Sequence, residues 1–259
     1  KRQDPEAVMV VLSADHLIRN VAAFNAALQA AVEVARQGFL VTLGITPDEP
    51  HTGFGYIQRG SLLREVGVFS AYRVARFVEK PDRGHAEAYL RDGGYSWNAG
   101  IFVWRVDAIM QAFQRYMPQL YDQLMAIEAR GGPHEPAAFE GVWDQVANTT
   151  IDYGVLEQAE QMAVIPVDIG WNDVGDWNTL TSLANSSSAG NVVQANHIHV
   201  DTTGTLIYSD GNRLIATVGL ENFLVIDTGD VLLIAPRERA QDVKKLVDQL
   251  RSHGRSDVL

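Results

Sequence analysis

Asp15 and a loop at residues 171–177 are the first candidates in this chain for binding a charged ligand. Asp15 follows a short apolar run at residues 8–12, and Asp173 lies in a glycine-containing loop, residues 171–177, with Trp171 and Trp177. Indole rings favour burial and carboxylates resist it, so a cation shared with a phosphate would explain why they occur together. The alternatives are that Asp15 caps the next helix and that residues 171–177 form a tight turn with solvated carboxylates.

A second set of residues has the side chains that recognise a sugar phosphate. Glu79 and Lys80 end a predicted strand that Pro81 prevents from continuing. Glu79 can accept hydrogen bonds from hydroxyls and Lys80 can contact a phosphate, although a plain surface ion pair is the alternative. Gly55 can let the backbone approach a ligand or simply form a hairpin turn, and Asn98 offers an amide to sugar hydroxyls or completes a turn.

Composition excludes several classes of function. The formal net charge is -11 and no Lys/Arg-rich block is present, so nucleic acid is not expected as a partner, and a phosphate ligand would need a bridging cation. There are no cysteines, which rules out disulfides and thiolate metal sites. His197 and His199 lack an acidic partner at ligand spacing, and no serine nucleophile with a base stands out. No run approaches the roughly 18 apolar residues of a membrane span, and we expect a cytoplasmic protein.

The first part of the chain has an alternating α/β pattern that would position these side chains. An apolar strand at residues 8–12, a helix with Val21, Phe24 and Leu28 on one face, and a strand at 39–45 predict a βαβ unit and a parallel sheet. Further strands are predicted at 55–58, 66–69, 72–78, 99–104 and 162–167, and helices at 86–91, 107–116, 118–129 and 137–146. A full strand at the very start leads us to expect that the sequence begins inside its domain.

The last part of the chain has a different pattern. After a Ser/Asn/Gly-rich linker at 185–190, short β-branched runs occur at 197–200, 205–208, 214–218, 223–226 and 231–234. Their spacing predicts stacked β coils or a small β roll. Residues 238–251 predict an amphipathic helix with Val243, Leu246, Val247 and Leu250 on one face. We expect this face to pack in a homodimer; packing within its own domain is the alternative.

Five motifs in this order resemble the sugar nucleotidyltransferase family. They are Ala14-Asp15-His16, Gly53-Phe54-Gly55-Tyr56-Ile57, Phe77-Val78-Glu79-Lys80-Pro81, Trp97-Asn98-Ala99-Gly100-Ile101-Phe102 and Trp171-Asn172-Asp173-Val174-Gly175-Asp176-Trp177. Each is weak alone, but together they cover nearly the whole chain. The resemblance implies a Rossmann-like α/β nucleotidyltransferase domain at 1–184, incomplete at its N-terminus. A β-coil region similar to a left-handed β-helix, with a C-terminal helix, would follow at 191–259.

The resemblance also implies a reaction and a role for each site residue. The motifs are most like those of members that transfer GMP from GTP to mannose 1-phosphate, giving GDP-mannose and pyrophosphate with Mg²⁺. By this resemblance Asp15 and Asp173 hold Mg²⁺ and act in catalysis with Lys80. The residues that bind substrate would be Gly55, Glu79 and Asn98, together with Asp152 and Glu157, which match a further family stretch.

Two departures from the family pattern leave other functions open. The Gly-rich, basic signature loop of the family is expected before Lys1 and is not in this sequence, and Ser13 replaces a usual proline. One alternative is a non-catalytic sugar-phosphate-binding or assembly subunit of the same fold. Another is the same chemistry with a different sugar 1-phosphate or base. The presence of both carboxylates favours an enzyme, because a scaffold has no need of a metal pair.

Overall fold

The protein divides into two compact units. The computed structural model describes residues 4, 6–132, 135–173, 187 and 189–258 of the 259. The units are Lys1–Trp171 and Asn172–Leu259, and each is described here by itself. Half of the predicted linker at 185–190 falls outside the described residues, and the limits 1–184 and 191–259 stay a prediction. Within the described ranges, no helix combines the length and apolarity needed to cross a membrane.

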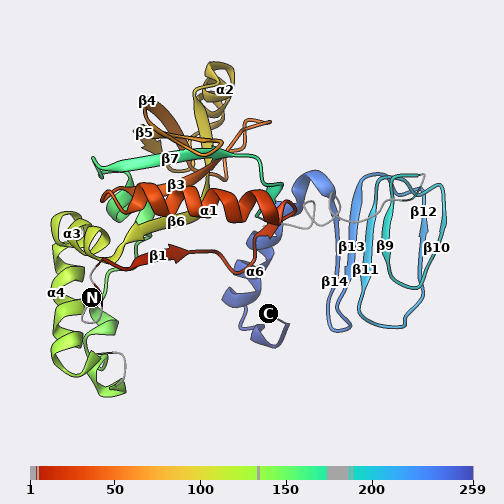
Figure 1. The fold of residues 1–259 in the computed structure, drawn as a ribbon. Coiled ribbons are helices and arrows are strands. Elements are labelled where there is room, and N and C mark those ends of the chain that lie inside the picture. Colours follow the sequence, from red (N-terminus) through yellow and green to blue (C-terminus); the bar gives the residue numbers. More distant parts are fainter. Residues whose placement is uncertain (1–3, 5, 133–134, 174–186, 188, 259) are drawn as a thin grey trace. The chain divides into compact units, whose positions relative to one another are not determined.

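The first unit is built on a six-stranded mixed sheet with the order β1-β6-β3-β7-β5-β4 (Figure 1). Its strands are β1 (Val8–Val11), β3 (Leu40–Ile45), β4 (Tyr56–Val66), β5 (Phe69–Val78), β6 (Tyr95–Arg105) and β7 (Met162–Val167). The predicted parallel relation of β1 and β3 is confirmed, but the strands are not neighbours. Because β6 lies between them and runs antiparallel to both, the sheet is mixed rather than parallel throughout, although β3 does pair in parallel with β7.

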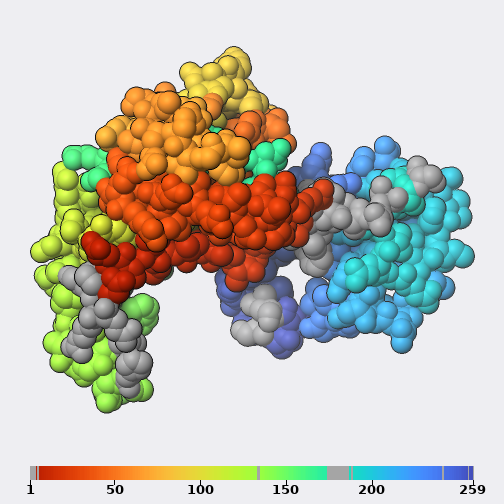
Figure 2. Space-filling model, in the orientation of Figure 1, coloured from red at the N-terminus to blue at the C-terminus, as the bar shows by residue number. Residues whose placement is uncertain are grey.

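The central strands are buried on both faces, and their side chains alternate between two cores. Helix α1 (Val21–Ala35) covers one face, where Val34 packs with Val41 and Ile165. The side chain of Asn20 caps this helix by accepting a hydrogen bond from Ala23 N, and Gly38 (φ +88°) follows its end. In Figure 2 the residues of α1 form a continuous red-orange band on the visible face of the first unit.

The opposite face of the sheet is covered by α3 (Val106–Tyr116) and a π-helical turn, Asp152–Leu156. Helix α4 (Pro118–Ala129) follows α3, and α2 (Arg83–Asp92) packs beside the aromatic residues near the start of β6. The predicted helix at 137–146 was wrong: the chain forms two 3₁₀ turns, Pro136–Ala138 and Trp143–Gln145, with the left-handed Gly141 between them. The predicted strand at 66–69 was also wrong, because the left-handed Gly67 turns β4 into β5.

The second unit is a β coil, as predicted. Its strands are β9 (Val192–Gln194), β10 (His197–Val200), β11 (Leu206–Ser209), β12 (Ile215–Val218), β13 (Phe223–Asp227) and β14 (Leu232–Pro236). Parallel pairing joins β9, β11 and β13 on one side of the coil and β10 and β12 on another, and β14 pairs antiparallel with β13. Coils of this kind stack short strands of neighbouring turns, so the strands of one side follow each other at regular intervals along the chain.

The chain ends in a 3₁₀ turn, Arg237–Asp242, and helix α6 (Val243–Ser252), followed by a second turn, Ser256–Val258. The predicted helix is therefore confirmed, although it begins several residues later. None of its residues is buried among those that the structure describes, and Leu246 is 47% exposed. The predicted homodimer stays a prediction.

Candidate functional site

Gly55 and Asn98 lie against each other where β6 meets the residue before β4. Asn98 N donates to Gly55 O at 2.8 Å. A Cβ atom on Gly55 would overlap the carboxylate oxygen Oε2 of Glu79 and lie 3.3 Å from Asn98 Cβ. Gly55 is therefore required for space rather than for an unusual backbone angle, and three of the predicted site residues are brought together.

A bulge in β6 directs the Asn98 side chain. Between the pairs Thr42↔Phe102 and Gly44↔Asn98, β3 has one residue and β6 has three, residues 99–101. Gly100 takes a left-handed conformation (φ +64°) in this bulge, and its N–H donates to Asn98 Oδ1 at 3.2 Å. Bulges often re-aim a side chain next to a functional site, and glycine is favoured where φ is positive.

Glu79 and Lys80 form an ion pair at the end of β5. Lys80 Nζ lies 3.0 Å from Glu79 Oε1; the Glu79 side chain is only 11% exposed, whereas that of Lys80 is 58% exposed. Lys80 has a positive φ of 47° and is followed by the buried Pro81. A non-glycine residue in this region costs on the order of 1 kcal/mol, and such strain gathers at functional sites.

The charges around this pair shift the pKa values of both residues. Burial is the main reason why the pKa of Glu79 is raised; the carboxylates of Asp152 and Glu157 raise it further, whereas Lys80 opposes the shift. The hydrogen bond to Glu79 raises the pKa of Lys80. Lys80 is therefore held as an exposed cation beside a carboxylate that resists ionisation.

The π-helical turn supplies the other two predicted substrate residues. Asn98 Nδ2 donates to Asp152 Oδ1 at 3.0 Å, and Glu79 N donates to Glu157 Oε1 at 3.2 Å. The turn is anchored by Val155 and Leu156, which are fully buried. All six predicted residues of this region, including Lys80, thus belong to one connected group, in which Asp152 and Glu157 contact other site residues.

An aromatic wall, which the sequence analysis did not anticipate, adjoins Gly55. The rings of His51 and Phe54 stack at 3.9 Å, and Phe54 contacts the rings of Trp97 and Trp171 edge-on at 5.1 and 5.4 Å. Such a wall can pack against the apolar face of a sugar or base. The only signal in the sequence is the density of aromatic residues around the glycine motif.

Asp15 is exposed just beyond β1. Hydrogen bonds join the segment that follows Asp15 to the segment that precedes Asp173. Trp171 Nε1 donates to His16 Nδ1 at 3.1 Å, and Arg19 N donates to Gly170 O at 3.2 Å. Asp173 is two residues beyond Trp171 and belongs to the second unit, and residues 174–177 of the predicted loop lie outside the described residues. That Asp15 and Asp173 bind the same Mg²⁺ ion stays a prediction.

Comparison with known proteins identifies the family of the chain. A family model described as nucleotidyl transferase matches residues 1–189, well over half of the chain. The chain belongs to the nucleotidyl transferase family. Beyond the nucleotidyl transferase segment, residues 195–250 match a MannoseP isomerase/GMP-like beta-helix domain, in agreement with the coil of the second unit.

Relatives of this chain include proteins with a named activity. The chain is 40% identical to xanthan biosynthesis protein XanB of Xanthomonas campestris pv. campestris and 37% identical to mannose-1-phosphate guanylyltransferase of Escherichia coli K12, in each case over 99% of this chain and 54% of the relative. The chain thus spans about half the length of these curated relatives. A crystal structure from Thermus thermophilus, described as a mannose-1-phosphate geranyltransferase, matches with a TM-score of 0.82 and 34% identity. That match covers 94% of this chain and 70% of the other.

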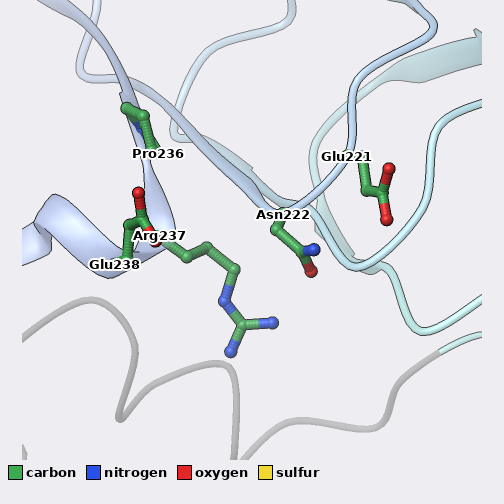
Figure 3. A pocket seen from close by; sticks show the side chains of 5 residues that line it. All are labelled: Glu221, Asn222, Pro236, Arg237 and Glu238. Atoms are coloured by element: carbon green, nitrogen blue, oxygen red, sulfur yellow. The ribbon is translucent and has the colours of Figure 1, made fainter.

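A separate groove lies in the second unit of the nucleotidyl transferase chain. It is lined by Glu221, Asn222, Pro236, Arg237 and Glu238 and encloses about 500 Å³ (Figure 3). Arg237 also donates to Gly204 O at 3.0 Å. None of the predicted site residues lines this groove, whereas the connected group that includes Gly55, Glu79 and Asn98 lies in the first unit.

Proposed function

We propose that this chain carries the sugar-phosphate site and a metal-binding carboxylate pair of an enzyme that transfers GMP from GTP to mannose 1-phosphate. The products would be GDP-mannose and pyrophosphate. The observation that carries the proposal is the meeting of Gly55 before β4, Glu79 after β5 and Asn98 in β6, with the cation of Lys80 beside them. The relatives named mannose-1-phosphate guanylyltransferase support this choice of substrates.

The connected polar group fits recognition of a sugar bearing a phosphate. Glu79 supplies carboxylate oxygens that accept hydrogen bonds from hydroxyls, and Asn98 supplies an amide N–H. The exposed ammonium of Lys80 is suited to a phosphate oxygen. The absent Cβ of Gly55 leaves the carboxylate of Glu79 close to the backbone, so a ligand hydroxyl can reach both.

The donors of the proposed metal pair fit Mg²⁺. Asp15 and Asp173 offer hard carboxylate oxygens, and Mg²⁺ commonly takes one or two protein carboxylates with water and phosphate completing its shell. When bound, Mg²⁺ would offset the repulsion between the two reacting phosphates.

The protein's own residues would then mainly bind and orient. The sugar-phosphate oxygen attacks the α-phosphorus of the nucleotide while pyrophosphate leaves in line, so positioning supplies much of the rate enhancement. Glu79 and Asn98 would fix the sugar, and Lys80 would keep its phosphate near the reaction centre. No protein nucleophile is needed for this displacement.

The test is pyrophosphate release by the full-length protein from GTP and mannose 1-phosphate, with and without Mg²⁺, and detection of GDP-mannose by chromatography. Asp15→Asn and Asp173→Asn should each lower kcat on the order of a hundred-fold or more, because charge stabilisation by a metal contributes several kcal/mol. Asp122→Asn is the matched control, since Asp122 is exposed on α4 and has the same charge.

Other outcomes of the same assay distinguish the alternatives. Binding of mannose 1-phosphate without Mg²⁺-dependent pyrophosphate release would support a non-catalytic subunit instead. Faster turnover with ATP, CTP or UTP, or with glucose 1-phosphate, would assign a different base or sugar. Near-normal turnover of Asp173→Asn would show that this residue is not a metal ligand.

We further propose that the protein forms a homodimer. The apolar residues of α6 are not buried among the described residues, and an apolar stripe on a helix usually packs against another surface. Light scattering should give twice the mass of one chain, and a monomer at micromolar concentration would contradict the proposal.

A further inference from the structure

The side-chain amide of Asn98 is contacted from three sides by polar groups. Its Oδ1 accepts from Gly100 N at 3.2 Å and lies 3.3 Å from the hydroxyl Oγ1 of Thr42, and its Nδ2 donates to Asp152 Oδ1 at 3.0 Å. These groups come from β3, the β6 bulge and the π-helical turn. Sequence analysis did not single out Thr42.

The chemistry of these neighbours determines which way the amide points. A backbone N–H can only donate and a carboxylate can only accept, so Oδ1 must face Gly100 and Nδ2 must face Asp152. A flipped amide would place its N–H groups against the N–H of Gly100 and its oxygen against the carboxylate. Among the residues that the structure describes, none accepts the second hydrogen of Nδ2, which leaves that hydrogen for a ligand.

Thr42 is the unusual member of this set. It lies in the apolar strand β3 and is completely buried, with 0% of its surface exposed. Burying a hydroxyl carries a cost that only a hydrogen bond offsets, and valine would fill the same volume without it. Its other acceptor, Leu43 O, is at 3.4 Å in the adjacent residue. The Thr42 hydroxyl is therefore best explained by its contact with the side-chain amide of Asn98.

We propose that Thr42 is a positioning residue, which with Gly100 N and Asp152 fixes the Asn98 amide so that it donates a hydrogen bond to the sugar phosphate. This inference rests on the proposed function, because it assigns a ligand to the same site. The atom of the ligand that meets Asn98 is then an oxygen that accepts, such as a hydroxyl lone pair. Thr42 itself does not touch the ligand.

The test compares Thr42→Val with Thr42→Ser in the full-length protein. Thr42→Val keeps the β-branched shape and removes the hydroxyl, whereas Thr42→Ser keeps the hydroxyl and removes the methyl group. By the net strength of one hydrogen bond, Thr42→Val should raise the Kd and KM for mannose 1-phosphate roughly three- to ten-fold. The KM for GTP and the melting temperature should change little. Thr42→Ser should restore mannose 1-phosphate binding to within about two-fold of the wild type.

A double-mutant cycle tests whether Thr42 acts through Asn98. It needs titration calorimetry with mannose 1-phosphate on Asn98→Ala and on the double variant Thr42→Val/Asn98→Ala. If Thr42 acts through Asn98, adding Thr42→Val to Asn98→Ala should cause no further loss of affinity. Additive losses, or equal losses for Thr42→Val and Thr42→Ser that track the melting temperature, would overturn the proposal and leave Thr42 a packing residue.

The same variants separate this inference from the proposed function. If Asn98→Ala weakens mannose 1-phosphate binding and Thr42→Val does not, only the role of Thr42 is wrong. If Asn98→Ala leaves that affinity unchanged, Asn98 does not bind the sugar phosphate. The proposed site then fails together with the inference that depends on it.

Discussion

The Glu79 side chain shows how a candidate binding residue can lower the stability of the fold that carries it. It is 11% exposed, and burial raises its pKa above the ordinary value of 4.5, with Asp152 and Glu157 adding to the shift. A raised pKa in the folded state means that the folded protein binds this proton more tightly than the unfolded chain does. The contribution of Glu79 to stability is therefore greatest at acid pH and falls as the pH rises through its folded pKa.

Replacing Glu79 with glutamine should reveal this cost. Glu79→Gln cannot ionise, so its melting temperature should exceed that of the wild type at pH 7, and the difference should shrink towards zero as the pH falls to about 4. Binding of mannose 1-phosphate should weaken on the order of ten-fold or more, because a charged acceptor is lost. Thermal melts across pH and titration calorimetry measure the two effects.

The control is Glu33→Gln on α1, where the side chain is 57% exposed. It should not reproduce the pH-dependent difference. If Glu79→Gln changed the melting temperature by the same amount at every pH, the shifted ionisation of Glu79 would not be the cause.

Site residues could be predicted where the sequence places unusual types together. Gly55, Glu79 and Asn98 lie in motifs with glycine, proline or a charge next to strands, and all three meet in the structure. Thr42 could not be predicted, because one threonine in an apolar strand is also a common β-former. Its importance depends on which side chain faces it across the sheet, and that is a property of the fold rather than of the local sequence.

At the scale of elements, the close packing of Glu79 and Asn98 where β4, β5 and β6 meet involves a position without a side chain, Gly55. Gly55→Ala would place Cβ against the Glu79 carboxylate and 3.3 Å from Asn98 Cβ, so one of these groups must move. We expect a loss of about 1–3 kcal/mol in stability from overpacking, together with weaker mannose 1-phosphate binding. Denaturant unfolding and titration calorimetry test both.

Gly84→Ala is the matched control, because Gly84 lies in α2 and its added Cβ would meet only Asp82 Oδ1, at 3.4 Å. It should bind normally and be as stable as the wild type or slightly more so, since alanine favours a helix. Normal binding by Gly55→Ala would show that this space is not part of the sugar-phosphate site.

Helices and strands were predictable from local pattern, whereas their pairing was not. The apolar spacing of α1 and the β-branched runs of the coil give element type directly. The antiparallel position of β6 between β1 and β3 depends on contacts between residues far apart in sequence, which no local pattern encodes. The helix expected at 137–146 failed because the left-handed Gly141 interrupts it.

The bond between Trp171 and His16 links two segments that carry the proposed metal ligands. Trp171→Phe keeps an aromatic ring but removes the N–H that donates to His16 Nδ1. If this bond positions the neighbouring carboxylates, the Mg²⁺ concentration for half-maximal activity should rise several-fold, in line with one lost hydrogen bond. Activity measured against Mg²⁺ concentration tests this.

Trp104→Phe is the control for loss of an indole, because Trp104 Nε1 is buried and has no hydrogen-bond partner among the described residues. It should lower stability by leaving a cavity without changing the Mg²⁺ requirement. An equal shift in the Mg²⁺ requirement for both variants would mean that the effect comes from packing.

For the whole molecule, the two units hold buried carboxylates whose pKa values shift in opposite directions. Asp227, in the second unit, is 2% exposed, and burial alone would raise its pKa. Hydrogen bonds from Gly229 N, the Arg213 guanidinium and the Ser209 hydroxyl outweigh burial and lower it. Asp227 therefore contributes stability above its ordinary pKa of 3.8, and this contribution is lost as the pH falls through its folded pKa.

Asp227→Asn should consequently lower the stability of the β coil at neutral pH and have little effect on it at acid pH. The amide keeps the shape but loses the charge that pairs with Arg213 at 2.8 Å, so part of that buried network is left unsatisfied. Hydrogen exchange of the full chain at pH 7 should quicken in β11 and β13 and remain unchanged in β3 and β7. The difference in melting temperature between the variant and the wild type should shrink as the pH falls below about 4.

Asp257→Asn removes the same charge from an exposed pair with Arg255 and should change neither measurement. Faster exchange spread equally over both units would instead mean that Asp227 stabilises the chain as one cooperative body, and that the two units do not respond to pH separately.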